Sequence, residues 1–305
     1  MKNMIKSMRD AFGEAMLELG RINPKVVALT GDLGPSVRLG AFKEAFPDRY
    51  FNVGVAEANM IGVAAGLALE GFIPFCASFA VFLPGRCFDQ IRVSICQNKV
   101  NVKLVGSHAG LSNPGDGATA QSVEDLALMR VLPEMKVICP ADARETKKAV
   151  LAMAEEKGPI YLRISREETP LVTAEEDPFE IGKARVLKEG KKVTIIACGT
   201  MVDVALRAGE VVDGEVINLS TIKPLDKETI LKSVKKTGRV ITIEEHSIYG
   251  GMGSAVAEFL SQEYPVPIRI MGIDDVFGQS ARNYKELLEK YGLTTENIIK
   301  NFQLF

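Results

Sequence analysis

The sequence lacks several features that would assign it to common functional classes. It has no tryptophan and only two histidines, His108 and His246, which excludes a histidine-rich metal centre. Its five cysteines are scattered, odd in number and without a C-x-x-C pair. The cysteine pattern therefore predicts neither a disulfide framework nor a zinc site, and we expect buried reduced thiols.

The chain also has no large excess of positive or negative charge and no long apolar run. The formal net charge is -2 and the pI is about 5.9, so the chain offers no broad basic surface for a nucleic acid or an anionic membrane. No run approaches the ~20 apolar residues of a membrane span, and Met1–Lys6 is not an apolar signal core. We expect a cytoplasmic protein with no nucleic acid partner and no membrane partner.

Short β-branched runs alternate with amphipathic helical patterns through the first half of the chain. The expected strands are Lys25–Leu29, Tyr50–Val53, Ile73–Ala77, Val102–Gly106, Lys136–Cys139 and Ile160–Arg163. Such alternation is typical of a mostly parallel sheet flanked by helices. The sequence therefore predicts an α/β domain over residues 1–166.

A stretch with two prolines and an acidic cluster, residues 167–183, interrupts this rhythm and is predicted to be a linker. The alternation then restarts over residues 184–305, which predicts a second, smaller α/β domain. Its expected strands are Val193–Ala197, Glu215–Leu219, Val240–Glu244 and Ile268–Met271, and its clearest helix is Met252–Tyr264.

One carboxylate, Glu57, lies in an otherwise small and apolar segment, residues 52–68. Burying an unpaired carboxylate costs several kcal/mol. The residue is therefore a candidate for function, although a glutamate at a helix N-terminus can also serve only to interact with the helix dipole.

Other chemically capable residues follow the ends of the predicted parallel strands. In open parallel sheets, ligands bind beyond the carboxyl ends of the strands, so these residues would meet at one edge. They are Asp32, Ser36, Glu57, Phe79, Phe82, His108, Asp116 and Arg166. Most of them have a structural alternative: Asp32 and Ser36 could cap helices, Phe79 and Phe82 could be core, Asp116 could lie in a turn, and His108 could be a structural histidine with its hydrogen bonds satisfied.

The order and spacing of these residues resemble the pyrimidine-binding and C-terminal domains of the transketolase family over nearly the whole chain. The matching segments are Leu29–Leu33, Asn52–Glu57, Ala77–Phe79 with Phe82, Arg86–Arg92, Gly106–Gly110, Glu124–Arg130 and Glu244–His246. The upstream domain that binds the cofactor diphosphate in a full-length transketolase has no counterpart here. The Gly115-Asp116-Gly117 triplet lacks the context of that domain's motif.

The resemblance implies the small subunit of a split transketolase. Its cofactor would be thiamine diphosphate with Mg²⁺, the latter bound mainly by a partner subunit that carries the diphosphate-binding domain. The active site would lie at the subunit interface, and two copies of each subunit would form an α2β2 assembly. The reaction would transfer a two-carbon ketol unit from a ketose to an aldose, as in pentose phosphate metabolism.

The resemblance also implies roles for individual residues. Glu57 would hydrogen-bond to N1′ of the cofactor's aminopyrimidine, Phe79 would stack on that ring, Phe82 would line its pocket, and Asp32 would lie near the thiazolium. The residues implied to bind the distal phosphate of the sugar are Arg9, Ser36, His108 and Arg166. Asp116 would bind a substrate hydroxyl, and His108 is also a catalytic candidate.

Two departures from the family pattern leave the substrate open. Pro114-Gly115 replaces the usual Gly-Glu before Asp116, and Ala120 stands where the family has a His or Gln that contacts the donor ketose. Either Gln121 reaches the substrate by a changed loop path, or the substrate differs near its reactive end. The anion-binding set favours a terminal phosphate, although a sulfonate presents similar oxygens.

Other functions stay open at this point. A 2-oxo acid dehydrogenase E1 β subunit and a deoxyxylulose phosphate synthase share the same domains, although Arg166 and His108 favour a sugar phosphate over a bare 2-oxo acid. A non-catalytic scaffold subunit is less consistent with Glu57 and Phe79. A nucleotide-binding module would depend on Gly250-Gly251-Met252-Gly253 before a helix, which is a weak signal.

Overall fold

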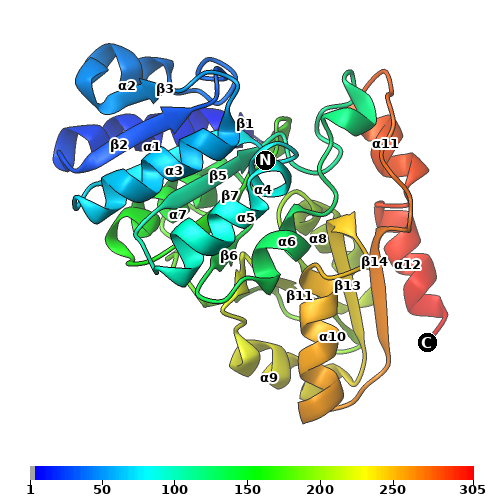
Figure 1. Cartoon of the computed structure of the whole chain (residues 1–305). Coiled ribbons are helices and arrows are strands. Elements are labelled where there is room, and N and C mark those ends of the chain that lie inside the picture. Colours follow the sequence, from blue (N-terminus) through cyan, green and yellow to red (C-terminus); the bar gives the residue numbers. More distant parts are fainter. Residues whose placement is uncertain (1–3) are drawn as a thin grey trace.

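The computed structural model describes residues 4–305. They form two α/β units that lie side by side, each built on a sheet with helices on both faces (Figure 1). The helices are α1 (Met8–Ile22), α2 (Gly40–Ala45), α3 (Glu57–Leu69), α4 (Leu83–Arg86), α5 (Phe88–Gln90), α6 (Asp125–Val131), α7 (Ala143–Glu155), α8 (Met201–Val212), α9 (Lys227–Thr237), α10 (Met252–Glu263), α11 (Tyr284–Lys290) and α12 (Thr295–Gln303). Short 3-10 or π-helical turns are η1 (Pro47–Arg49), η2 (Ile91–Gln97) and η3 (Gly117–Thr119).

The strands fall into a seven-stranded sheet, a five-stranded sheet and a two-stranded pair. They are β1 (Ile5–Ser7), β2 (Val26–Thr30), β3 (Tyr50–Asn52), β4 (Ile73–Phe79), β5 (Lys103–Ser107), β6 (Lys136–Ile138), β7 (Ile160–Arg163), β8 (Glu168–Pro170), β9 (Arg185–Lys188), β10 (Val193–Ala197), β11 (Gly214–Asn218), β12 (Thr221–Lys223), β13 (Val240–Ser247) and β14 (Ile268–Ile273). The predicted α/β class with a mostly parallel sheet is confirmed.

The first sheet has the order β12-β6-β7-β5-β4-β2-β3, and all its strands except β12 run parallel. Helices α1 and α7 pack together on one face, while α3, η2 and α6 cover the other. Strands β2 and β5 are buried along their whole length because both faces are covered. The six parallel strands therefore deliver their carboxyl ends to one common edge.

Helix α1 shows how the sequence sets the position of a site residue. Ser7 caps the helix, because its hydroxyl accepts a hydrogen bond from the Asp10 N–H at 3.2 Å. Met8, Phe12 and the later apolar residues of the same face are buried against the sheet. Arg9 is thereby held in the first turn of the helix, at the ligand-binding edge.

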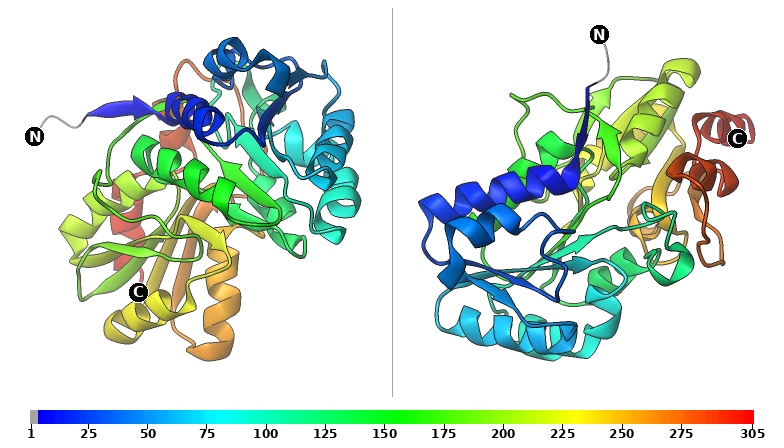
Figure 2. Two further views of the ribbon diagram at one scale, coloured as in Figure 1. Left: turned by 90° about the vertical axis from the view of Figure 1, so that its left-hand side faces the viewer. Right: turned by 90° about the horizontal axis from the view of Figure 1, so that it is seen from above.

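The second sheet has the order β14-β13-β10-β11-β9, with only β9 antiparallel to its neighbour. Helices α9 and α10 pack on one face and α8, α11 and α12 on the other. Figure 2 shows α11 and α12, in red, on the outer flank of the molecule. No helix within residues 4–305 is both long and apolar enough to span a bilayer.

Two strand pairings were not expected from the sequence, and the first of them ties the two halves of the chain together. Strand β12, within the predicted second domain, extends the first sheet by pairing antiparallel with β6. Strand β8, within the predicted linker, pairs with β1. The apolar core under α3 and α6 also continues into α9 and α10, so the halves share one interior. All five cysteines are buried free thiols, as predicted.

Candidate active site

Residues from five parallel strands meet at the carboxyl edge of the first sheet. Asp32 follows β2, Glu57 begins α3 after β3, and Phe79 is the last residue of β4. His108 directly follows β5, and Arg166 lies just beyond β7. Because these strands are parallel neighbours, side chains distant in the sequence share one surface.

The Glu57 carboxylate is buried and has a cationic partner. Its side chain is only 4% exposed, whereas that of Arg86 is 50% exposed. Nη1 of Arg86 lies 3.2 Å from both carboxylate oxygens. The guanidinium compensates a charge that would otherwise be costly to bury.

Aromatic rings form a wall beside this carboxylate. The Phe79 and Phe82 rings are stacked with centroids 5.5 Å apart, and the His108 ring stacks on Phe79 at 3.7 Å. The guanidinium carbon of Arg86 lies 4.1 Å from the centroid of the Phe82 ring. A planar cation is thus held between a buried carboxylate and an aromatic face.

His108 is buried in an electropositive environment. Its φ of 56° is left-handed, and its Nδ1 lies 2.9 Å from the Ser107 hydroxyl. Burial, reinforced by Arg9, Arg166 and Arg38, lowers the pKa of His108 to about 3. The imidazole is therefore neutral near pH 7 and can donate one hydrogen bond without carrying charge.

Arginine side chains gather around His108. Nη1 of Arg9 donates to the Ser36 carbonyl at 3.0 Å, and within residues 4–305 its buried Nε has no hydrogen-bond partner. Burial, followed by the charges of Arg38 and Arg166, lowers the pKa of Arg9. An unsatisfied buried N–H among mutually repelling guanidinium groups is suited to an anionic ligand.

Asp32 and Ser36 do not cap helices, which removes that structural alternative. The nearest helix, α2, begins at Gly40 with Leu39 as its N-cap. Asp32 is exposed, and its Oδ1 accepts from Nδ2 of Asn52 at 2.8 Å. Ser36 contacts Arg9 through its carbonyl oxygen rather than its hydroxyl.

Asp116 and Arg166 are connected through a residue that sequence reasoning missed. The Asn113 amide donates from Nδ2 to Oδ2 of Asp116 at 2.8 Å, and its Oδ1 accepts from Nη1 of Arg166. The Arg166 N–H also donates to the Ser112 hydroxyl at 3.0 Å. Only the position of Asn113 in the divergent loop could have drawn attention to it.

Arg38 and Arg86 were also missed. Arg86 begins a segment that carried the family resemblance, so the motif could have flagged it. Arg38 has no comparable motif, and its Nε pairs with Oδ1 of Asp10 at 2.5 Å. Its positive charge helps to lower the pKa of Arg9 and the pKa of His108.

The contacts of Gln121 bear on the departure from the family pattern at Ala120, where a methyl group replaces a His or Gln. Nε2 of Gln121 donates to the carbonyl oxygens of Asn113 at 3.2 Å and Gln279 at 2.9 Å. The amide hydrogens are therefore used within the protein. The structure therefore gives no support to the first sequence-based explanation, in which Gln121 donates to the substrate by a changed loop path.

The C-terminal half of the chain holds the same loop. Oε1 of Glu245 accepts the Leu111 N–H at 2.5 Å, and its Oε2 accepts from the Tyr284 hydroxyl at 2.6 Å. Gly110 has a φ of +62°, and a Cβ there would lie 2.5 Å from Oε1 of Glu245. A side chain at Gly110 would separate the loop from its anchor.

Sequence models of two known domains together match nearly the whole chain. The sequence model of the transketolase pyrimidine binding domain matches residues 5–172, and that of the transketolase C-terminal domain matches residues 182–298. The chain belongs to the transketolase family. Membership implies thiamine diphosphate as the cofactor.

Individual relatives cover almost the same length as this family member. A putative transketolase C-terminal section of Methanocaldococcus jannaschii is 44% identical over 98% of the chain and 96% of the relative. A 6-deoxy-6-sulfo-D-fructose transketolase subunit of Clostridium sp. (strain MSTE9) is 42% identical over 96% and 92%. The solved structure of a split gene transketolase, described as an inactive beta4 tetramer, is 48% identical over 97% of both chains, with a TM-score of 0.89.

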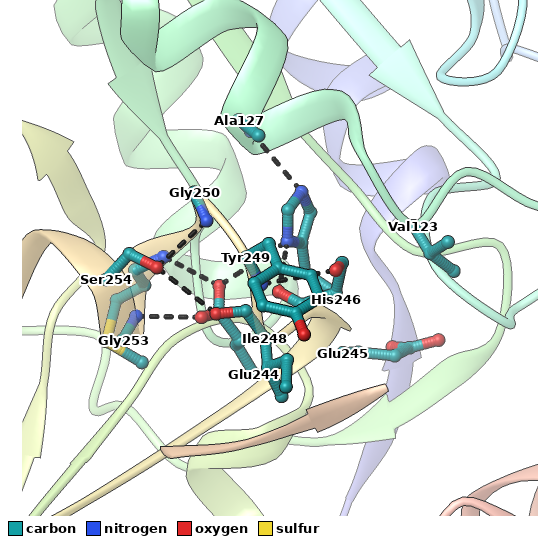
Figure 3. Close-up of polar contacts among 12 residues, drawn as sticks. Val123, Ala127, Glu244, Glu245, His246, Ile248, Tyr249, Gly250, Gly253 and Ser254 are labelled. Atoms are coloured by element: carbon teal, nitrogen blue, oxygen red, sulfur yellow. Dashed lines mark hydrogen bonds and ion pairs between the residues drawn. The ribbon is translucent and has the colours of Figure 1, made fainter. Parts of the chain in front are cut away.

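A second polar cluster in this transketolase-family chain is structural (Figure 3). The buried Glu244 carboxylate accepts the N–H groups of Met252 and Gly253, each at 2.7 Å, at the start of α10. His246 accepts the Ala127 N–H of α6 at Nε2, at 3.3 Å. A side chain of the protein already occupies the helix N-terminus that a nucleotide phosphate would need, so the nucleotide-binding alternative is not supported.

The Glu57–Arg86 pair predicts a defined stability change in the free chain. Arg86→Met should lower the free energy of unfolding by about 1–3 kcal/mol, because it leaves a buried carboxylate without its partner. Glu57→Gln combined with Arg86→Met should recover most of that loss. Urea denaturation measures both, with Arg92→Met, on the exposed side of η2, as the matched control. An Arg86→Met chain as stable as the wild type would contradict the pairing.

The environment of His108 predicts its protonation state. Its ring should stay neutral as the pH falls well below the ordinary histidine value of 6.5, because its pKa is lowered to about 3. The unfolded chain takes up this proton first, so His108 reduces the stability of the fold as pH falls between these values. NMR of the ring protons, assigned with His108→Gln, tests this. A His108 signal that titrates near 6.5 would contradict both the burial of the ring and the effect of the arginine cluster on it.

Proposed function

We propose that the chain is the small subunit of a two-polypeptide transketolase. With its partner subunit it transfers a two-carbon ketol unit from a ketose to an aldose. The observation that carries this proposal is the buried Glu57 carboxylate beside the Phe79 and Phe82 rings, on the same sheet edge as an arginine-rich anion site. The lengths and descriptions of the relatives support it.

The residues around Glu57 fit the pyrimidine end of thiamine diphosphate. When bound, this cofactor carries the two-carbon unit between the donor and acceptor sugars. Glu57 would hydrogen-bond to the ring nitrogen N1′ and hold it in its protonated form, Phe79 would stack on the ring, and Phe82 would line its pocket. Arg86 already holds a planar cationic group between Glu57 and Phe82, so the pocket has room and a carboxylate for a planar ring that is protonated at N1′. Arg86 would have to leave this position for the ring to enter.

The partner subunit would bind the diphosphate and supply most of the ligands to Mg²⁺. Within residues 4–305 no group of three or more His, Cys, Asp or Glu side chains is placed to hold a metal ion. Along α3, which begins at Glu57, and in its flanks, apolar side chains suited to a protein interface are exposed: Val55 and Leu69 are each 73% exposed, and Val63 and Phe72 are each 36% exposed. Two copies of each subunit form an α2β2 assembly.

The arginine cluster binds the terminal anion of the sugar. Arg9 offers an unused buried N–H, Arg166 a guanidinium held by Asn113, and neutral His108 one further donor. Ser36 closes this site next to Arg9. We favour a phosphate over a sulfonate, because several guanidinium groups match the higher charge of a phosphate monoester. The clostridial relative is named for a sulfo sugar, so a sulfonate substrate is the specific alternative.

The remaining residues orient the reacting end of the substrate. Asp32 is exposed at the edge of the site, where it would lie near the thiazolium. Asp116 would bind a substrate hydroxyl. His108 lies between the aromatic wall and the arginine cluster, where it can hydrogen-bond to a substrate oxygen. A cytoplasmic location stays a prediction.

Carbon transfer tests this function directly. The chain is assembled with its partner subunit, thiamine diphosphate and Mg²⁺, and given a ketose phosphate labelled with ¹³C in its first two carbons and an unlabelled aldose phosphate. Mass spectrometry should find a new ketose that carries both labels. In parallel assays, release of ¹³CO₂ from pyruvate labelled at its carboxyl carbon, without ketol transfer, would identify a 2-oxo acid enzyme instead. Turnover of sulfonated sugars alone would show that the substrate carries a sulfonate rather than a phosphate.

A further inference from the structure

Asn113 lies at the centre of the loop between β5 and α6 and is completely buried. Its side chain makes two hydrogen bonds, one through each polar atom, and both partners are proposed substrate-binding residues. Nδ2 donates to Oδ2 of Asp116 at 2.8 Å, and Oδ1 accepts from Nη1 of Arg166. A carboxylate and a guanidinium that bind opposite ends of a sugar are therefore joined by one amide.

The chemistry of this bridge requires an amide. Arg166 can only donate and an ionised Asp116 can only accept, so the residue between them must offer both an acceptor and a donor. A leucine of similar size could satisfy neither group, and an aspartate could satisfy only Arg166. These two partners determine that the amide oxygen of Asn113 faces Arg166 and that its amide nitrogen faces Asp116.

The surrounding backbone makes the bridge rigid. The Asn113 carbonyl oxygen accepts from Nε2 of Gln121 at 3.2 Å and from the Gly117 N–H at 3.4 Å. The neighbouring Ser112 hydroxyl accepts the Arg166 N–H at 3.0 Å and donates to the Ala109 carbonyl at 2.7 Å. Arg166 is thus held at its backbone and at its guanidinium by consecutive residues.

The loop has few other side-chain groups that could hydrogen-bond to a substrate hydroxyl. Ala120 carries only a methyl group, and the Gln121 amide hydrogens are bound to the carbonyl oxygens of Asn113 and Gln279. Apart from His108 at its start, this loop therefore relies on Asp116 to bind a substrate hydroxyl. The direction of that carboxylate depends in turn on Asn113.

We propose that Asn113 is a positioning residue that sets specificity, because it fixes the spacing between the anion-binding Arg166 and the hydroxyl-binding Asp116. Sugars whose terminal anion and hydroxyl match this spacing are accepted, and their epimers are rejected. This inference rests on the proposed function, since it takes Arg166 and Asp116 as substrate contacts.

The test compares Asn113→Leu, Asn113→Asp and the wild type in the assembled complex, with ketose phosphates that are epimers at one hydroxyl. Asn113→Leu should raise KM for the preferred donor about tenfold, because a charge-assisted hydrogen bond is lost at each end, and should lower kcat much less. Its preference between epimers should fall about tenfold. Asn113→Asp should keep more of the phosphate affinity, since it still accepts from Arg166, yet lose the preference between epimers.

Ser112→Ala is the matched control, because it removes two hydrogen bonds from the same buried loop and leaves the Asn113 bridge in place. Its effect should be equal for both epimers. If Asn113→Leu also changes both epimers equally, the residue is only structural and the inference is wrong.

A binding measurement separates this inference from the proposed function. Calorimetric titration of the wild-type complex and Asn113→Leu with inorganic phosphate needs no turnover. Weaker phosphate binding in Asn113→Leu, by about fivefold or more, supports the link to Arg166 even if ketol transfer is not the reaction. Equal phosphate affinity in both complexes would overturn the link, whatever reaction the wild type catalyses.

Discussion

The burial of one carboxylate, Glu57, is the constraint on which the rest of the site depends. It lies at the first residue of α3, is almost inaccessible to solvent, and needs a cation or hydrogen-bond donor beside it. In the free chain Arg86 meets that need while it also lies over Phe82. In the proposed function, the same requirement suits the pocket to a planar ring that donates to the carboxylate from a protonated nitrogen. Under that proposal the stability of the free chain and the binding of the cofactor both depend on Glu57.

The parallel sheet brings together the other residues of the site. Successive crossovers bring Asp32, Phe79, His108 and Arg166 to one edge, and α1 adds Arg9 from a neighbouring helix. The C-terminal half is more than a separate module, because Glu245 anchors the substrate loop at Leu111. Each half of the chain therefore controls part of the same surface.

Much of this arrangement could be predicted from the sequence, because strand periodicity and strand ends are local features. The parallel strands and the residues that follow them were expected, as was the isolation of Glu57 among apolar residues. Strand β12 could not be predicted, since it has three residues and pairs with β6, far earlier in the chain. The partners of Arg86 and Asn113 depend on helix geometry and loop conformation that no local pattern encodes. Those two side chains connect predicted site residues to one another.

The most direct test of the central role of Glu57 is to compare Glu57→Gln with the wild type in the complex assembled with the partner subunit. Cofactor affinity, measured by calorimetry, and kcat for ketol transfer are both required. The structure predicts that Glu57→Gln still binds thiamine diphosphate, while kcat falls by about 10²–10⁴-fold, as expected when a group that directs proton transfer is lost. Near-normal kcat in Glu57→Gln would contradict the role assigned to the buried carboxylate.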